Sequence, residues 1–107
     1  MIPLDELASP ERFHPRVEAA LTVRVDVNGR AFLAKTRDLS MDGVFLIGKA
    51  PVNVRRLVIT LPLPGGREIV TGADVKRYGT DGLAVQFDQL DWDDLIALAR
   101  YLAPRIA

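Results

Sequence analysis

Hydrophobic and polar residues alternate along several short stretches of the chain. The clearest stretch is residues 21–27, where every second residue is leucine or valine and the residues between are polar or charged. A period of two predicts a strand with one buried face. Asn28-Gly29 follows directly and favours a tight hairpin turn, because a type I′ turn needs positive φ at both central residues. A second strand is therefore expected over residues 30–37, although its alternation does not assign its faces.

Four more strands are predicted further along the chain. They cover residues 44–47, 57–61, 67–78 and 83–87. Turn-forming residues separate them, with Gly, Pro, Asp and Ser gathered in residues 38–43, 48–51, 62–66 and 79–82. Gly72, inside the longest of these strands, is expected to form a β-bulge.

The period changes from two to that of a helix near the C-terminus. Asp91 suits the N-cap, and Leu90 and Leu95 occupy the positions of a hydrophobic staple. Pro104 is expected to end the helix. The apolar stripe predicted to face the core consists of Trp92, Leu95, Ile96, Ala99 and Leu102.

Six short strands followed by one amphipathic helix predict an all-β fold. The expected architecture is a six-stranded antiparallel β-barrel, closed or nearly so, with a C-terminal α-helix packed over one end or side. Residues 1–18 are expected to form an N-terminal lead-in, and residues 19–107 the barrel and helix, as a single domain overall. Pro15 favours an extended conformation for the residue before it, so the end of the lead-in is not expected to be helical.

Composition restricts where charge and reactivity can lie. The 107 residues carry 14 basic and 14 acidic side chains and no cysteine. Balanced charge gives no global attraction to nucleic acid or to an anionic membrane, so any anion site must be local. The start of the chain lacks a signal peptide, and no apolar run approaches a membrane span, which favours a cytoplasmic location. Neither a catalytic constellation nor a metal-ligand spacing stands out, so we expect no enzyme and no metal site.

Two polar motifs flank the first two predicted strands. An RxxxR motif lies in the lead-in, and a DxSxxG motif lies in the turn before the third predicted strand. Arginine forks pair with phosphates or with the O6 and N7 atoms of guanine, whereas an aspartate accepts from guanine N1–H and N2–H. The set suits a small ligand with phosphate charge and a purine edge. Its members are Arg12, Arg16, Asp38, Ser40 and Gly43.

This organisation resembles the PilZ domain, a bacterial receptor module for cyclic di-GMP, over about residues 10–103. In that family RxxxR precedes the first strand and (D/N)xSxxG joins the second strand to the third, and all five motif residues are present here. The resemblance implies that these five residues bind cyclic di-GMP without a cofactor, and we expect His14 and Arg77 as additional contacts. It further implies a second-messenger receptor in bacterial signal transduction, in which ligand orders the lead-in and relays the signal to an unidentified protein partner.

Two alternatives come from other classes. Glu11 stands where many PilZ domains carry another basic residue, and an acid beside a diphosphate is unfavourable. This departure favours a protein-interaction adaptor that keeps the fold without physiological ligand binding. A small barrel that binds single-stranded nucleic acid is the third class, but such barrels combine a basic groove with exposed aromatic residues, which the neutral charge argues against. Both a monomer and a homodimer are compatible with the sequence.

Overall fold

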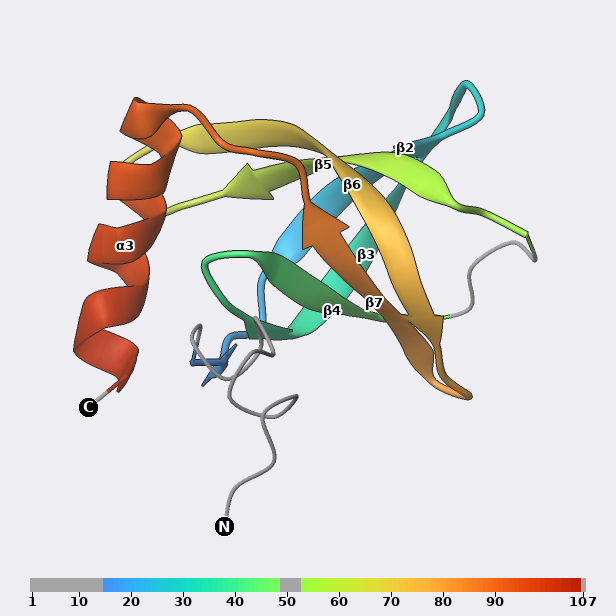
Figure 1. Ribbon diagram of the computed structural model, residues 1–107, viewed down its shortest axis with the longest axis horizontal. Coiled ribbons are helices and arrows are strands. Elements are labelled where there is room, and N and C mark those ends of the chain that lie inside the picture. Colours follow the sequence, from blue (N-terminus) through green and yellow to red (C-terminus); the bar gives the residue numbers. More distant parts are fainter. Residues whose placement is uncertain (1–14, 49–52, 107) are drawn as a thin grey trace, which may run out of the picture.

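The computed structural model describes residues 15–48 and 53–106, and these residues form strands followed by one C-terminal helix (Figure 1). In chain order the elements are β1 (Val17–Glu18), β2 (Thr22–Val27), β3 (Arg30–Leu39), β4 (Gly43–Ile47), β5 (Arg56–Pro62), β6 (Glu68–Tyr78), β7 (Gly82–Phe87) and α3 (Trp92–Ile106).

Six of the strands close into an antiparallel barrel. β2 pairs with β3 and β5, β5 with β6, β6 with β7, β7 with β4, and β4 returns to β3. The all-β fold and the six-stranded barrel with a C-terminal helix, both predicted from the sequence, are confirmed. The short β1 is an addition to that prediction, since two residues carry no period that a sequence pattern can show.

The first hairpin follows the predicted pattern closely. Val23, Val25 and Val27 are buried inside the barrel. Asn28 and Gly29 turn the chain with φ of 50° and 80°, which places both central residues of the turn in the left-handed region. β1 lies beside the far end of β3, where Glu18 is opposite Asp38. β1 and β2 therefore both pair with β3, and residues 19–21 separate them.

α3 covers one end of the barrel, as Figure 1 shows at the left of the molecule. Leu98 and Leu102 are almost fully buried and belong to the same core as the barrel interior. The backbone N–H of Asp94 donates to Asp91 Oδ1 at 2.8 Å, which confirms Asp91 as the N-cap.

The apolar stripe predicted for this helix was partly wrong. Trp92 is 73% exposed and Ala99 is also exposed, whereas the buried side chains are Leu98 and Leu102, with Leu95 packed partly against the core. A spacing of three and four residues places Leu95, Leu98 and Leu102 on one face, next to the face that carries Trp92. The helix buries the face of the three leucines.

Two sequence-based expectations about backbone breaks were also wrong. The helix passes Pro104 and ends at Ile106. A proline removes one backbone donor, and this costs little here because the helix ends two residues later. Gly72 stays in register opposite Val58, and the β6–β7 register shifts instead between Val75 and Arg77. Gly72 has another reason to lack a side chain: a Cβ there would meet the Arg56 guanidinium and the Asp88 carboxylate.

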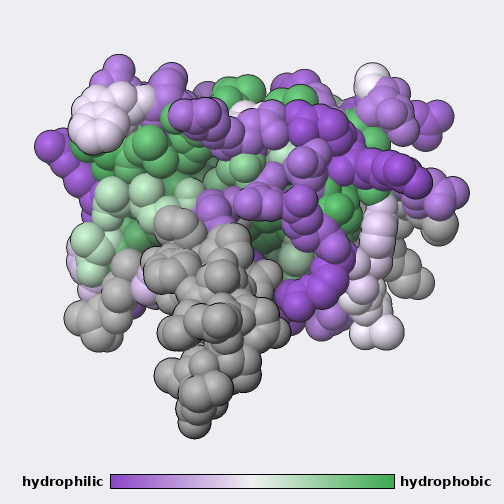
Figure 2. Space-filling model, viewed as in Figure 1, coloured by the Kyte–Doolittle hydropathy of each residue, from purple (hydrophilic) through white to green (hydrophobic). Residues whose placement is uncertain are grey.

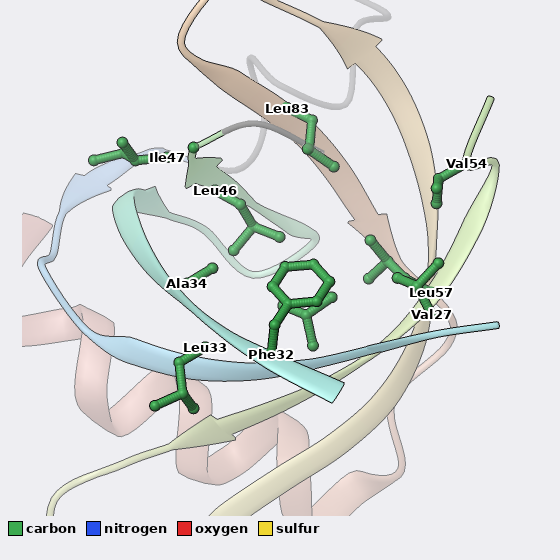
Figure 3. Close-up of a pocket in the computed structure, with 11 residues that line it drawn as sticks. Val27, Phe32, Leu33, Ala34, Leu46, Ile47, Val54, Leu57 and Leu83 are labelled. Carbon is green, nitrogen blue, oxygen red and sulfur yellow. The ribbon is translucent and has the colours of Figure 1, made fainter. Parts of the chain in front are cut away.

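The end of the barrel opposite α3 holds an apolar cavity of about 160 Å³. Figure 3 shows its lining side chains, which come from β2, β3, β4, β7 and the start of β5. Phe32, Leu33 and Ile47 at this end are large apolar residues exposed to solvent. The two barrel ends therefore differ, since the helix closes one of them and the other is lined by apolar side chains at the surface.

Candidate functional site

Hydrogen bonds tie the residues after β1 to β3. Thr36 is buried, and its hydroxyl donates to the carbonyl of Ala19 and accepts from the backbone N–H of Leu21 at 2.9 Å. The N–H of Ala19 donates in turn to the carbonyl of Arg37 at 3.1 Å. These bonds hold the end of the lead-in against the barrel, and so determine where Arg16, directly before β1, can reach.

Arg16 and Asp38 meet at this place. Arg16 Nη1 donates to Asp38 Oδ1 at 2.7 Å, and the two side chains are 31% and 17% exposed. They are 22 positions apart in the sequence, and pairing of β1 with the end of β3 brings them together. Asp38 thus belongs to the last part of β3, although the sequence placed it in a turn. The described half of the RxxxR motif and the first residue of the DxSxxG motif therefore form one cluster.

Arg37 is a second cation of this cluster that the sequence analysis missed. Its Nε donates to Asp38 Oδ2 at 3.3 Å, and its guanidinium lies 3.7 Å from the centroid of the Phe45 ring. The β3–β4 register shifts between Thr36 and Asp38, so Arg37 is the extra residue of a β-bulge. No sequence pattern indicated the bulge. The only signal for Arg37 was its position directly before the motif aspartate Asp38.

Ser40 and Gly43 shape the turn that follows Asp38. Ser40 is fully buried; its N–H donates to the Gly43 carbonyl at 2.9 Å, and its hydroxyl donates to Asp42 Oδ1 at 2.6 Å. A Cβ at Gly43 would overlap the carbonyl oxygen of Val85 in the neighbouring β7. Both residues thus hold the turn against the barrel by close packing and hydrogen bonds.

Arg77 shares an outer face of the barrel with Asp38. Residues directly opposite each other in antiparallel strands point to the same face, and the chain of partners runs from Asp38 to Phe45, Ala84 and Arg77. Three strand spacings place the two ends of this row about 14 Å apart. Figure 2 shows hydrophilic side chains over the part of this face that β4, β7 and β6 form. Arg77 therefore lies along the face rather than within the Asp38 cluster.

The remaining predicted contacts fall outside the described part of the chain. Arg12 and His14 belong to residues 1–14, as does Glu11, and their proposed roles stay predictions. Within residues 15–48 and 53–106, three or more His, Cys, Asp or Glu side chains nowhere gather as a metal site would require. Among the same residues, α3 is neither long nor apolar enough to span a membrane.

The cluster has the chemistry of an anion site with a polar selector. Arg16 and Arg37 both donate to the Asp38 carboxylate, and Arg37 Nη1 also lies 4.0 Å from Asp81 Oδ2, which leaves unused N–H donors on both guanidiniums. Arg37 is further preorganised by its contact with Phe45. An incoming anion can pair with these forks, and the Asp38 oxygens can then accept from N–H groups of the same ligand.

Solved structures of other proteins share this fold. The Bacillus subtilis inhibitor of motility MotI/DgrA superposes with a TM-score of 0.74 at 19% identity over 91% of this chain, which spans 51% of that protein. The Escherichia coli YcgR PilZ domain with c-di-GMP gives 0.68 at 14% identity, covering 86% of this chain and 88% of the other. The K. pneumonia MrkH–c-di-GMP complex gives 0.68 at 21% identity, covering 90% and 52%.

The comparison with curated protein sequences found no match. The family model of the PilZ domain, in contrast, matches residues 10–103, which include both polar motifs, all of the barrel strands and most of α3. With the barrel, the helix and the Arg16–Asp38 contact in place, this match over most of the chain shows that the protein belongs to the PilZ domain family.

Proposed function

We propose that this chain is a receptor domain for cyclic di-GMP in the bacterial cytoplasm. The observation that carries the proposal is the contact between Arg16 and Asp38, which unites two motifs from distant parts of the sequence in one cluster. Relatives of the same fold, YcgR and MrkH, were solved with c-di-GMP, and this supports the choice of ligand. The ligand-binding residues we propose are Arg12, Arg16, Asp38, Ser40 and Gly43, with His14 and Arg77 as additional contacts.

Each part of the ligand has a matching group. Arg16 exchanges its bond to Asp38 for a phosphodiester oxygen or for the O6 and N7 edge of a guanine. Asp38 then accepts from guanine N1–H and N2–H, which an adenine does not offer. A direct contact of Ser40 requires its hydroxyl to leave Asp42, because the residue is fully buried. Arg37, held over the Phe45 ring, adds a flat surface on which a base can stack.

Isothermal titration calorimetry of the chain with cyclic di-GMP tests the ligand, with GTP and cyclic di-AMP as controls. We expect saturable binding that is selective for the guanine dinucleotide. Arg16→Ala and Asp38→Ala should each weaken it by about hundredfold, since each removes a charge-assisted contact to the ligand. Arg24→Ala is the matched control, because Arg24 pairs with Asp26 on another part of the surface. Normal binding by either site variant, with unchanged thermal stability, contradicts the site.

The proposed output is a change in the lead-in. Ligand bound by both motifs ties residues before β1 to the barrel, and a protein partner reads the new arrangement. Amide hydrogen exchange of residues 5–18 is expected to slow when the site is saturated. Unchanged exchange in that segment, at a ligand concentration where calorimetry shows full occupancy, contradicts the relay and leaves the receptor assignment intact.

The second candidate function is an adaptor that binds a protein partner without a physiological nucleotide. Glu11 favours it, because a carboxylate directly before the first motif arginine repels a diphosphate. Absence of both calorimetric heat and a thermal shift at millimolar cyclic di-GMP would support this candidate. If Glu11→Arg then restored binding, the loss would be traced to that one residue.

A further inference from the structure

A cleft lined by arginines lies away from the Asp38 cluster. It is a cleft of about 370 Å³ between α3 and the turn that joins β5 to β6. Arg67 lines it from the turn, and Arg100 and Arg105 line it from the helix. One acidic partner is present, since Arg67 Nη2 donates to Asp94 Oδ1 at 2.9 Å. Among the described residues, three arginines against one aspartate leave two positive charges at this cleft, in a chain whose charges balance.

Two of these arginines are ready to bind an anion. Arg105 is held in place: its Nη1 donates to the carbonyl of Tyr101 at 2.6 Å, and its guanidinium lies 3.9 Å from the Tyr101 ring centroid. Fixing the side chain in advance lowers the entropy that binding would cost. Arg100 forms no ion pair within residues 15–48 and 53–106, so no carboxylate of these residues competes for its guanidinium.

The rest of the cleft is apolar. Leu63 is buried, and Ala97 and Tyr101 are partly buried against the core, while Pro64 is exposed at the turn. An apolar wall beside guanidinium groups matches an occupant that has an apolar side chain with carboxylates next to it.

We propose that this cleft is a docking site for an acidic segment of a partner protein, in which leucine or an aromatic residue enters the cleft and flanking Asp or Glu residues pair with Arg100 and Arg105. The inference stands apart from cyclic di-GMP binding and requires no nucleotide. α3 does contact β1, the strand that follows Arg16, so the helix that forms one wall of the cleft also adjoins the nucleotide site proposed above.

Fluorescence polarisation with the full chain tests the docking site. The probe is a fluorescein-labelled twelve-residue peptide in which leucine and phenylalanine alternate with pairs of aspartate and glutamate. Arg100→Gln and Arg105→Gln should each weaken its binding by about tenfold, the loss expected for one charge-assisted hydrogen bond. Arg30→Gln is the matched control, because Arg30 is exposed at the hairpin on the other end of the barrel and its loss changes net charge equally. Binding should be measurable without cyclic di-GMP.

Two further arms separate peptide binding from attraction of any anion. A peptide with asparagine and glutamine in place of the acids, and one with serine in place of the apolar residues, should both bind at least tenfold more weakly. Equal binding of either peptide overturns the proposal, as does native affinity in Arg100→Gln with an unchanged melting temperature. Displacement of the probe by inorganic phosphate at low millimolar concentration also overturns the proposal. The same holds if the probe fails to bind while the chain sediments with phosphatidylglycerol vesicles and Arg100→Gln abolishes that sedimentation.

Discussion

Two clusters of arginine and aspartate on this barrel have opposite composition. At the candidate site, the single carboxylate of Asp38 accepts from two arginines, Arg16 and Arg37. On β5 and β6, the single guanidinium of Arg56 donates to two carboxylates, to Asp74 at 2.7 Å and to Asp88 at 2.7 and 3.0 Å. Among the hydrogen-bonded side chains, arginine is in excess in the first cluster and carboxylate in the second, and Arg37 also lies 4.0 Å from Asp81.

The difference in composition goes with a difference in construction. Arg56 lies directly opposite Asp74 within regular β5–β6 pairing, and it also donates to Asp88, which follows directly after β7. The Asp38 cluster depends instead on a two-residue strand and on a bulge, and its arginines keep unused donors. Within the described residues, the Asp38 cluster can accept an anion, whereas the two carboxylates around the single guanidinium of Arg56 repel one. An ion pair is thus a poor guide to function until the charges around it are counted.

The largest effect on stability is expected at the glycine beside each cluster, Gly43 or Gly72. A Cβ at Gly43 would overlap the backbone oxygen of Val85, which cannot move without breaking the β4–β7 pairing. Gly43→Ala should therefore lower the free energy of unfolding by about 3 kcal/mol. Gly72→Ala should cost much less, because a Cβ there meets only the flexible ends of Arg56 and Asp88.

Urea denaturation of both alanine variants measures these two losses on a common scale. Equal losses of unfolding free energy would show that the side chains of Arg56 and Asp88 are as hard to displace as the backbone of Val85. Such a result would remove the distinction in construction between the clusters.

The buried hydroxyl of Thr36 offers the next largest effect. Thr36→Val removes the bonds to Ala19 and Leu21, and it should lower stability by about 2 kcal/mol because buried backbone groups lose their partners. Since these bonds hold the segment next to Arg16, affinity for cyclic di-GMP should also fall by about tenfold. Chemical denaturation and calorimetry measure the two effects. Thr22→Val, at an exposed position of β2, is the control. Full affinity in Thr36→Val would show that ligand binding does not depend on the hydrogen bonds of Thr36.

The smallest expected effect is a dependence of the Arg56 cluster on pH. Hydrogen bonds from Arg56 lower the pKa of Asp88 below its ordinary value of 3.8, and partial burial opposes the shift. A carboxyl whose pKa is lower in the folded state stabilises the fold above the unfolded-state pKa. That contribution is lost as the pH falls below 3.8 and through the folded-state value.

Thermal melting between pH 7 and pH 3 checks the size and sign of this effect. The difference in melting temperature between the native chain and Asp88→Asn should be largest near neutral pH and should shrink toward pH 3. Glu68→Gln, which removes an exposed carboxylate on β6, provides the control. A difference that grows with acidity would mean that Asp88 does not gain stability from its pairing with Arg56.

The sequence predicted elements wherever local chemistry decides the structure. Alternation in residues 21–27, the Asn28-Gly29 turn and the Asp91 cap each depend on neighbours in the chain, and all three are present. The predicted bulge at Gly72 was wrong, because the space that this glycine leaves is used by side chains from β5 and from beyond β7. Such a contact between distant segments has no local signal.

The candidate site was predictable in part for the same reason. The motif spacing indicated that Arg16 and Asp38 belong together, and their contact is present, whereas their role in ligand binding stays a prediction. Arg37 was missed because its position follows from a shift in the β3–β4 register. The row from Asp38 to Arg77 likewise follows from pairing across β4 and β7, which alternation alone does not specify.

Closure of the barrel limits how this protein can meet other chains. In a ring of six strands, the backbone N–H and C=O groups of each strand are directed at neighbours on both sides, and in the described residues only β1 borders the ring as a short flank. Among these residues a partner finds no long free edge on which to add a strand, and cross-β aggregation has no template there. Recognition by the described part of the domain uses side chains, so its specificity can change by surface substitution while the sheet stays intact.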